Sequence, residues 1–256
     1  MYSLEHIAYL KKEKREKIIV SIFRISIVFL FLIVWELLSK YNIINTFLFS
    51  SPSRIINTLT SIELFKHIKI TLYEVIISFM LSTIIGILIA SIMWRYKLFS
   101  KIIDPYITIF NSLPKVALGP LFIIWVGAST KSIIVMAITI SIFTTIINVY
   151  NGFISVNDSY ILLMHSFKAN KIQIFEKVIL PSNIRNIIAT LKINISLSLI
   201  GVIMGELLVS KEGLGYLIMY GSQVFNLDLV ISSIFVLGII SYLMYFIIDV
   251  IEKRLI

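Results

Sequence analysis

Six polar side chains interrupt long apolar stretches of the sequence, where hydrogen-bonding groups are costly unless they have partners. Their amides and hydroxyls can donate and accept hydrogen bonds, and the lysine among them adds a charge that hydrocarbon tolerates poorly. Such groups either join neighbouring helices or line a polar pathway, and their spacing fits both. Lys115 can also pair with an acid or reach lipid headgroups. The candidate pathway residues are Asn111, Ser112, Lys115, Thr144, Asn194 and Ser198.

No pattern in the sequence supports catalysis on a substrate. No nucleophile and base share one apolar stretch or loop, so no catalytic residue is expected. Cysteine is absent and the three histidines, His6, His67 and His165, are scattered, so neither a metal nor a cofactor is expected. The phosphate-binding pattern GxxxxGK[ST] is also missing, so an ATP-driven step would require another chain.

A moderately polar stretch, 156–184, separates two apolar blocks and predicts two short helices joined by a bend. Asn157, Asp158 and Ser159 can cap the first helix, and Asn170 tolerates a left-handed turn. Pro181 is expected to end the second helix, because it lacks a backbone donor. One face of the first helix would carry Tyr160, Leu163, Met164 and Phe167. This face can contact a partner, or it can pack against the chain's own helices.

The composition indicates an all-α protein that crosses a membrane several times. Of the 256 residues, 58% are hydrophobic and 14% are charged, and several apolar runs exceed the roughly twenty residues that span hydrocarbon. Six spans are predicted, at about 18–38, 69–94, 102–126, 132–151, 184–208 and 229–250. A charged N-terminal tail, 1–17, would precede a transmembrane domain, 18–256, that contains a loop at 152–183.

The basic residues predict the orientation of the spans. Clusters at 11–17, 95–101, 168–185 and 253–254 would share one side of the membrane, and the other side would keep fewer Lys and Arg. The chain is expected in the inner or plasma membrane of a cell. Because cytoplasmic loops are rich in Lys and Arg, both termini and the 156–184 stretch are expected in the cytoplasm. This topology accounts for the net charge of +9 without a nucleic-acid partner.

Small residues and prolines predict details of individual spans. Pro114 and Pro120 predict a kinked third span beside a water-accessible path. Gly213 permits a tight turn before the last span, and Glu206 can pair with a lysine. A close-packing seam in the second span is predicted from residues at four-residue spacing, Ser78, Ser82, Gly86 and Ala90.

Three stretches, in the same order and spacing, resemble the permease subunits of ATP-binding-cassette (ABC) importers of the nitrate, sulfonate, taurine and bicarbonate class. They read FSSPSRIINTL (49–59), SLPKVALGPLFIIWVGASTKSIIV (112–135) and GELLVSKEGLGYLI (205–218). The resemblance covers nearly the whole chain from about residue 47. It implies a six-transmembrane-helix, MetI-like permease fold with a cytoplasmic coupling helix.

In that family the cytoplasmic loop carries a signature of Glu-Ala-Ala, three residues, Gly, nine residues, Ile, one residue and Leu-Pro. Val178, Leu180 and Pro181 keep its right-hand end in register. Leu162, Leu163 and Met164 stand where Glu-Ala-Ala would be, and Lys168 stands where the glycine would be, with Ala169 and Asn170 available to form the turn instead. The resemblance implies that an ATPase docks on Tyr160, Leu163, Met164, Phe167, Lys168 and Ala169.

The resemblance also implies the partners: two copies of a separate ATPase, an extracytoplasmic solute-binding protein and a second copy of this chain. The solute would be a sulfonate, nitrate or taurine-like anion, or an organic solute like a thiamine precursor. The alternative is an ion-coupled secondary transporter, which normally needs acids or histidines within the membrane. The acids argue against it because they lie near span ends, at Glu36, Glu74, Asp104, Glu206 and Asp249.

Overall fold

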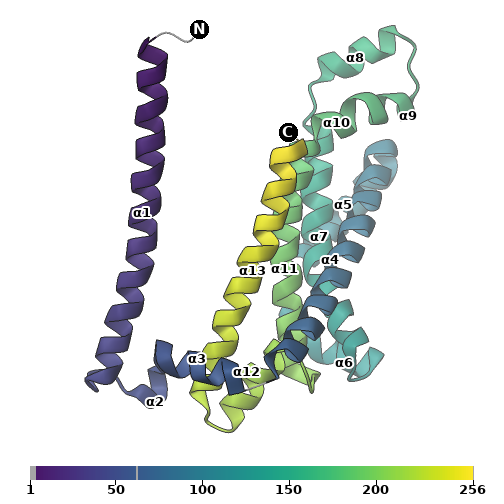
Figure 1. Cartoon of the computed structure of the whole chain (residues 1–256). Coiled ribbons are helices and arrows are strands. Elements are labelled where there is room, and N and C mark those ends of the chain that lie inside the picture. The colour runs from purple at the N-terminus through teal and green to yellow at the C-terminus, as the bar shows by residue number, and fades with distance from the viewer. Residues whose placement is uncertain (1–3, 62, 256) are drawn as a thin grey trace.

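The computed structural model describes residues 4–61 and 63–255, which are almost entirely helical (Figure 1). Five helices are long and apolar enough to cross a membrane. They are α1 (Leu4–Lys40), α4 (Leu64–Arg95), α7 (Thr130–Ile154), α11 (Ile184–Val209) and α13 (Leu227–Leu255). Each contains one of the predicted spans, because continuous apolar runs of this length are a strong sequence signal.

The predicted third span, 102–126, is broken into two helices. α5 (Lys97–Ser112) and α6 (Gly119–Val126) are joined through a 3₁₀ turn, Lys115–Leu118, and are bent by 87°. Pro114 directly precedes the turn, and Pro120 lies in the first turn of α6, where its missing N–H costs little. The prolines therefore produce a sharper break than the kink that the sequence predicts.

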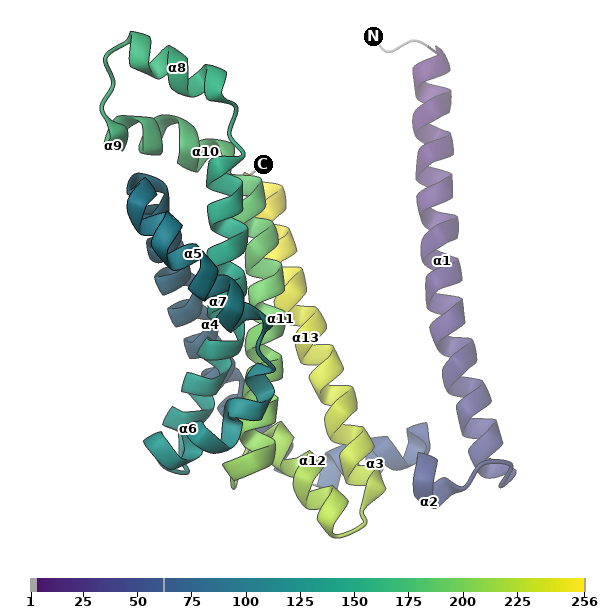
Figure 2. The ribbon, with the colours of Figure 1, turned by 180° about the vertical axis from the view of Figure 1, so that it is seen from behind.

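α1 is continuous from Leu4, so the charged residues predicted as a tail extend the first span as a helix. Both views show α1 standing away from the other long helices (Figures 1 and 2). It is fastened at its C-terminal end, where the Glu36 carboxylate accepts hydrogen bonds from the Ser53 N–H at 3.1 Å and the Ser53 hydroxyl at 2.6 Å. Most of its apolar side chains are exposed.

α4, α7 and α11 form the closely packed centre of the bundle. The predicted seam is confirmed, because Ser78, Ser82, Gly86 and Ala90 are all buried. Gly201 and Gly205 of α11 lie directly against Ala137 and Ile133 of α7. Small residues let these backbones approach closely, which is how helices associate where lipid supplies no hydrophobic drive.

Gly201→Ala is expected to lower stability by about 1–3 kcal/mol through overpacking. A methyl group at this position would lie 2.5 Å from the Ala137 Cα atom, and backbone cannot move aside as a side-chain tip can. Gly238→Ala in α13 is the matched control, since nothing lies within 4 Å of its added Cβ. Thermal unfolding of both purified variants checks this; equal midpoints would contradict the packing described here.

The shorter helices gather at the two ends of the bundle (Figure 1). The first turn of α1 and the last turn of α13 point the same way as the end of the bundle that carries α8 (Asp158–Ser166), α9 (Lys171–Ile174) and α10 (Leu180–Ser182), and we name this the α8 end. The α12 end carries α2 (Thr46–Phe49), α3 (Pro52–Ser61), α6 and α12 (Leu214–Gln223). Gly213, with φ of 105°, makes the predicted tight turn, which leads into α12 before the last span begins.

Candidate functional site

The first predicted helix of the 156–184 stretch is α8, and Asn157 caps it. The Asn157 side chain accepts a hydrogen bond from the Ser159 N–H at 2.8 Å, which satisfies one of the free donors of the first turn. Nine residues give α8 an inner and an outer face, and it lies across the end of the bundle rather than along it (Figure 1).

The outer face of α8 is apolar and uncovered. Tyr160, Leu163 and Phe167 are 58%, 54% and 72% exposed, so the predicted face does not pack against the chain's own helices at these three positions. Met164 differs, because it is half-buried and packs with Ile161 against a cluster at the ends of α4 and α7. We give the name docking face, after the contact that the family resemblance implies, to Tyr160, Leu163 and Phe167.

Lys168 makes the bend after α8, with φ of 54°. The sequence analysis assigned a left-handed turn to Asn170, which is wrong: Asn170 is extended, at φ of −79°, and caps α9 through reciprocal hydrogen bonds with Gln173, both 2.9 Å long. The position where the resembling family has glycine thus keeps a glycine-like conformation despite its lysine. Ala169, half-buried, packs into the cluster below.

Lys168→Gly is expected to raise stability by about 1 kcal/mol, because the left-handed conformation crowds the Cβ of any other residue. Lys171→Gly, three residues later and within α9, is the matched control and should lower stability by about 1 kcal/mol instead. Thermal unfolding of the two variants measures both effects. Shifts of the same sign would show that the left-handed turn does not strain the chain.

The second predicted helix does not end at Pro181. It runs from Lys171 through a π-helical turn, Phe175–Ile179, to Ser182, and α11 begins at Ile184. The Leu180 N–H bonds the Phe175 carbonyl five residues back, so the helix is widened directly before the proline. This widening relieves the clash that a proline ring makes with the preceding turn, so the helix continues past Pro181.

Phe175 links this widened turn to two of the long helices. Its ring lies 5.3 Å from that of Trp94 in α4 and 5.4 Å from that of Phe153 in α7, measured between centroids. Ile174 and Ile179 beside it are buried against Ala90 and Val149. A displacement of the α8–α10 segment would therefore be passed to α4 and α7 through packed side chains, not through a flexible loop.

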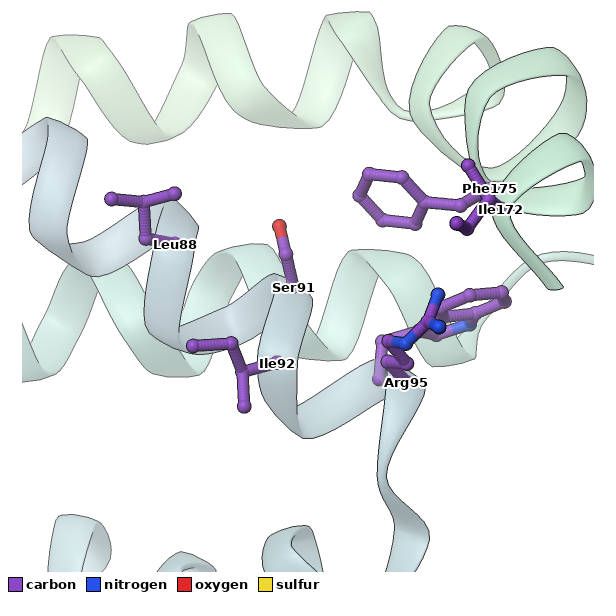
Figure 3. A pocket seen from close by; sticks show the side chains of 7 residues that line it. Leu88, Ser91, Ile92, Arg95, Ile172 and Phe175 are labelled. Atoms are coloured by element: carbon purple, nitrogen blue, oxygen red, sulfur yellow. The ribbon is translucent and has the colours of Figure 1, made fainter.

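Two cavities flank this connection. Figure 3 shows the smaller one, of about 180 Å³, between α4 and the α9 region, lined by apolar side chains with Arg95 at one side. The larger one, of about 650 Å³, separates α8 from the ends of α4, α5 and α7, and its lining includes Lys97, Lys101 and Asp158. α8 therefore rests on the bundle through a limited contact area.

Three of the six candidate pathway residues meet at the break between α5 and α6. The Asn111 side-chain oxygen accepts a hydrogen bond from the Lys115 ammonium at 3.0 Å and another from the Thr144 hydroxyl at 3.1 Å. All three side chains are half-buried. No ion pair found among residues 4–61 and 63–255 involves Lys115, so its charge is not neutralised by an acid there.

The other three candidates lie apart from this cluster. Ser112 is exposed and its hydroxyl donates to the carbonyls of its own helix. Asn194 and Ser198 are buried between α4 and α11, where the Asn194 amide contacts the hydroxyls of Ser82 at 3.1 Å and Thr83 at 2.7 Å. In this structure Asn194 joins α11 to α4, which is the alternative that the sequence left open, and the Ser198 hydroxyl donates to the Asn194 side-chain oxygen within α11.

Comparisons with known proteins identify the family of the chain. A sequence model of the family described as "Binding-protein-dependent transport system inner membrane component" matches residues 82–256. The formylaminopyrimidine transport permease protein ThiX of Halalkalibacterium halodurans is 29% identical over 217 residues, which are 83% of this chain and 86% of that protein. The putative aliphatic sulfonates transport permease protein SsuC of Bacillus subtilis is 25% identical over 226 residues, 87% of this chain and 82% of that protein.

The fold is also that of a solved transporter. A structure of inward facing conformations of the MetNI methionine ABC transporter aligns with a TM-score of 0.67 and 19% identity, covering 75% of this chain and 96% of that one. The family match spans well over half of the sequence and includes α7, the 156–184 stretch and α11. The chain belongs to the family of binding-protein-dependent transport system inner membrane components, and it is a membrane-spanning permease subunit of an ABC importer.

Proposed function

We propose that two copies of this permease form one pathway, that two copies of a separate ATPase grip α8, and that an extracytoplasmic binding protein delivers the solute. One observation carries the proposal: three apolar side chains, Tyr160, Leu163 and Phe167, stand exposed on a short helix outside the bundle. Exposed apolar and aromatic groups gathered on one helix face are typical anchors of a protein interface.

The α8 end lies in the cytoplasm in this proposal, where ATP is available. The helix ends and loops at that end of the bundle carry several basic residues: Lys97, Lys101, Lys168, Lys171 and Arg254. An excess of Lys and Arg next to spans is the feature that keeps loops on the cytoplasmic side. The binding protein would then approach the α12 end.

Transport would proceed by alternating access. When ATP closes the two ATPases, the docking face moves with them, and Phe175 transfers this movement to α4 and α7. A packed connection with two stable positions can carry such coupling, since both the nucleotide and the solute favour one position over the other. The permease itself performs no chemistry on the solute, and ATP hydrolysis takes place on the partner.

The second copy of the chain is proposed because most of the apolar surface of α1 is exposed in a single chain. Its apolar residues, such as Phe23, Phe29 and Phe31, are mostly exposed, and it lies apart from α13 (Figure 2). Lipid covers part of such a helix, and a neighbouring permease would cover another part. The pathway would then run between the copies.

Asn111, Lys115 and Thr144 are the residues that we propose for the pathway, together with the exposed Ser112. The unneutralised Lys115 would attract an anion, and Asn111 would hold it in position. A sulfonate, nitrate or taurine-like anion fits this charge. A thiamine-precursor-like organic solute is the second class, since ThiX is named for a formylaminopyrimidine.

Reconstitution in liposomes tests the proposal. The purified permease, its ATPase and its binding protein should together hydrolyse ATP in a solute-dependent manner and accumulate solute only when ATP is supplied. The permease without the ATPase should not transport. Uptake by the permease alone, driven by a proton gradient, would overturn the proposal in favour of an ion-coupled transporter.

A further inference from the structure

Two buried carboxylic side chains meet where α4, α11 and the start of α12 come together. Glu74 of α4 is 0% exposed and Glu206 of α11 is 1% exposed. Their carboxyl groups are close enough to interact with each other. The permease function described above makes no use of either residue, so this contact between two acids inside the bundle needs a separate physical account.

The Glu206 carboxylate is surrounded by the hydrogen-bond donors that an ionised carboxylate requires. One of its oxygens accepts a hydrogen bond from the Thr71 hydroxyl and the other from the Gly215 N–H, both at 2.6 Å. Thr71 in turn accepts from the Leu214 N–H at 2.9 Å. The Glu206 carboxylate thus caps the first turn of α12, where a negative charge is favourable. A Cβ atom at Gly213 or Gly215 would collide with this carboxylate.

Glu74 lacks such donors. Neither of its oxygens accepts a hydrogen bond from any group in the described chain, and its polar neighbours are the Glu206 carboxyl and the Thr130 hydroxyl of α7. The sequence left open a pairing of Glu206 with a lysine, and the described residues form no such pair. None of the ion pairs within the described residues includes Glu74 or Glu206.

The charged and titratable groups nearby are engaged elsewhere or are exposed. Lys66 pairs with Glu212 at 2.5 Å, and Lys69 lies over the ring of Phe65 at 4.6 Å. His67 accepts a hydrogen bond from the Gly213 N–H at 3.0 Å and stacks on Tyr216. Lys131, next to Thr130 on α7, is exposed.

We propose that Glu74 and Glu206 form one proton-binding site that fastens α12 to α4. Two neighbouring carboxylates within a buried interface cannot both be ionised, and they hold one proton between them. Glu74 carries the proton and donates it to Glu206, which remains the charged cap of α12. Loss of that proton places two like charges side by side, so α4 and α12 separate.

The test compares the thermal unfolding of the full-length chain and its variants in lipid nanodiscs at pH 6 and pH 9, in potassium salt. The wild type should lose roughly 4 °C or more of its midpoint at pH 9, the size of shift that a moderate destabilisation gives. Glu74→Gln should remove this loss, because its amide donates to Glu206 at every pH. His67 is unchanged in that variant, so a pH-dependent loss of stability caused by His67 would remain. Glu63→Gln, an exposed acid next to α4, is the control and should keep the wild-type response.

A second measurement does not depend on stability. Infrared spectra of the wild type should contain a band of a protonated carboxylic acid that Glu74→Gln lacks and Glu63→Gln retains. Equal pH responses in the wild type and Glu74→Gln, or no difference in this band, would overturn the proposal. Recovery of the pH 9 midpoint by sodium but not by potassium would also overturn it, because the site would then hold a metal cation instead of a proton.

Discussion

Replacing Phe167 by aspartate is expected to weaken the binding of the ATPase to the permease by about 30-fold or more. Phe167 is 72% exposed and lies at the end of the docking face, where burial in a cleft would remove its ring from water. An aromatic anchor buried in an interface contributes about 2 kcal/mol or more, and a buried unpaired carboxylate adds a further penalty. Co-purification of the ATPase with the tagged permease measures the effect.

Phe225→Asp is the matched control for this prediction. Phe225 is also 72% exposed, but it lies between α12 and α13, at the opposite end of the bundle. The variant should insert into the membrane and retain the ATPase like the wild type. If both variants lose the ATPase equally, the loss reflects general damage, and if neither does, α8 is not the contact.

Replacing Phe175 by alanine is expected to separate ATP hydrolysis from transport. The ring fills the space between Trp94 and Phe153, and its removal should cost about 2 kcal/mol, less than for a fully buried phenylalanine. The docking face is unchanged, so the ATPase should still bind. Solute-dependent stimulation of ATP hydrolysis should fall at least several-fold, because the movement of α8 is no longer passed on to α4 and α7.

Two further variants make the Phe175 result specific. Phe175→Leu restores most of the volume and should recover much of the stimulation. Phe246→Ala removes the same aromatic ring from α13, where it stacks on Tyr242 of the same helix, and should leave stimulation unchanged. Normal solute-dependent hydrolysis in Phe175→Ala would show that α8 is coupled to the transmembrane helices through other contacts.

The long apolar helices could be predicted from the sequence because their signal is local. A run of apolar residues longer than twenty identifies a span whatever surrounds it, and Asn157 caps α8 within its own turn. The 87° break was underestimated, since a proline marks where a helix is interrupted but not the direction in which the chain continues.

Contacts between residues that are far apart in the sequence could not be predicted. Met164 shares a helical face with Leu163 by spacing, yet it is turned toward Phe153 and its neighbours, which only the fold brings near. The contact between Glu74 and Glu206 crosses 132 positions of the chain, and nothing in either local sequence indicates it. The left-handed turn at Lys168 is a local feature instead, and the sequence predicts it at Asn170 because asparagine adopts this conformation more readily than lysine.

In the candidate pathway, too, a contact within one helix follows from the sequence, and a contact between helices does not. Asn111 and Lys115 are one helical turn apart, so their contact follows from the sequence. Thr144 joins them from α7 and could be placed there only by the packing of α5 on α7. Asn194 has a similar polar side chain, but the small residues of α4 lie against it and bury it.

Cross-linking from a single introduced cysteine tests the central claim most directly. The chain contains no cysteine, so Phe167→Cys supplies the one reactive thiol, and Phe225→Cys places it at the other end. In sealed membrane vesicles of known orientation, a short bifunctional reagent should join Cys at 167 to the ATPase, and only from the cytoplasmic side, whereas Cys at 225 should not react with it. Labelling at 167 from the outer side, or the absence of any ATPase adduct there, would contradict the assignment of α8 as the helix that the ATPase moves.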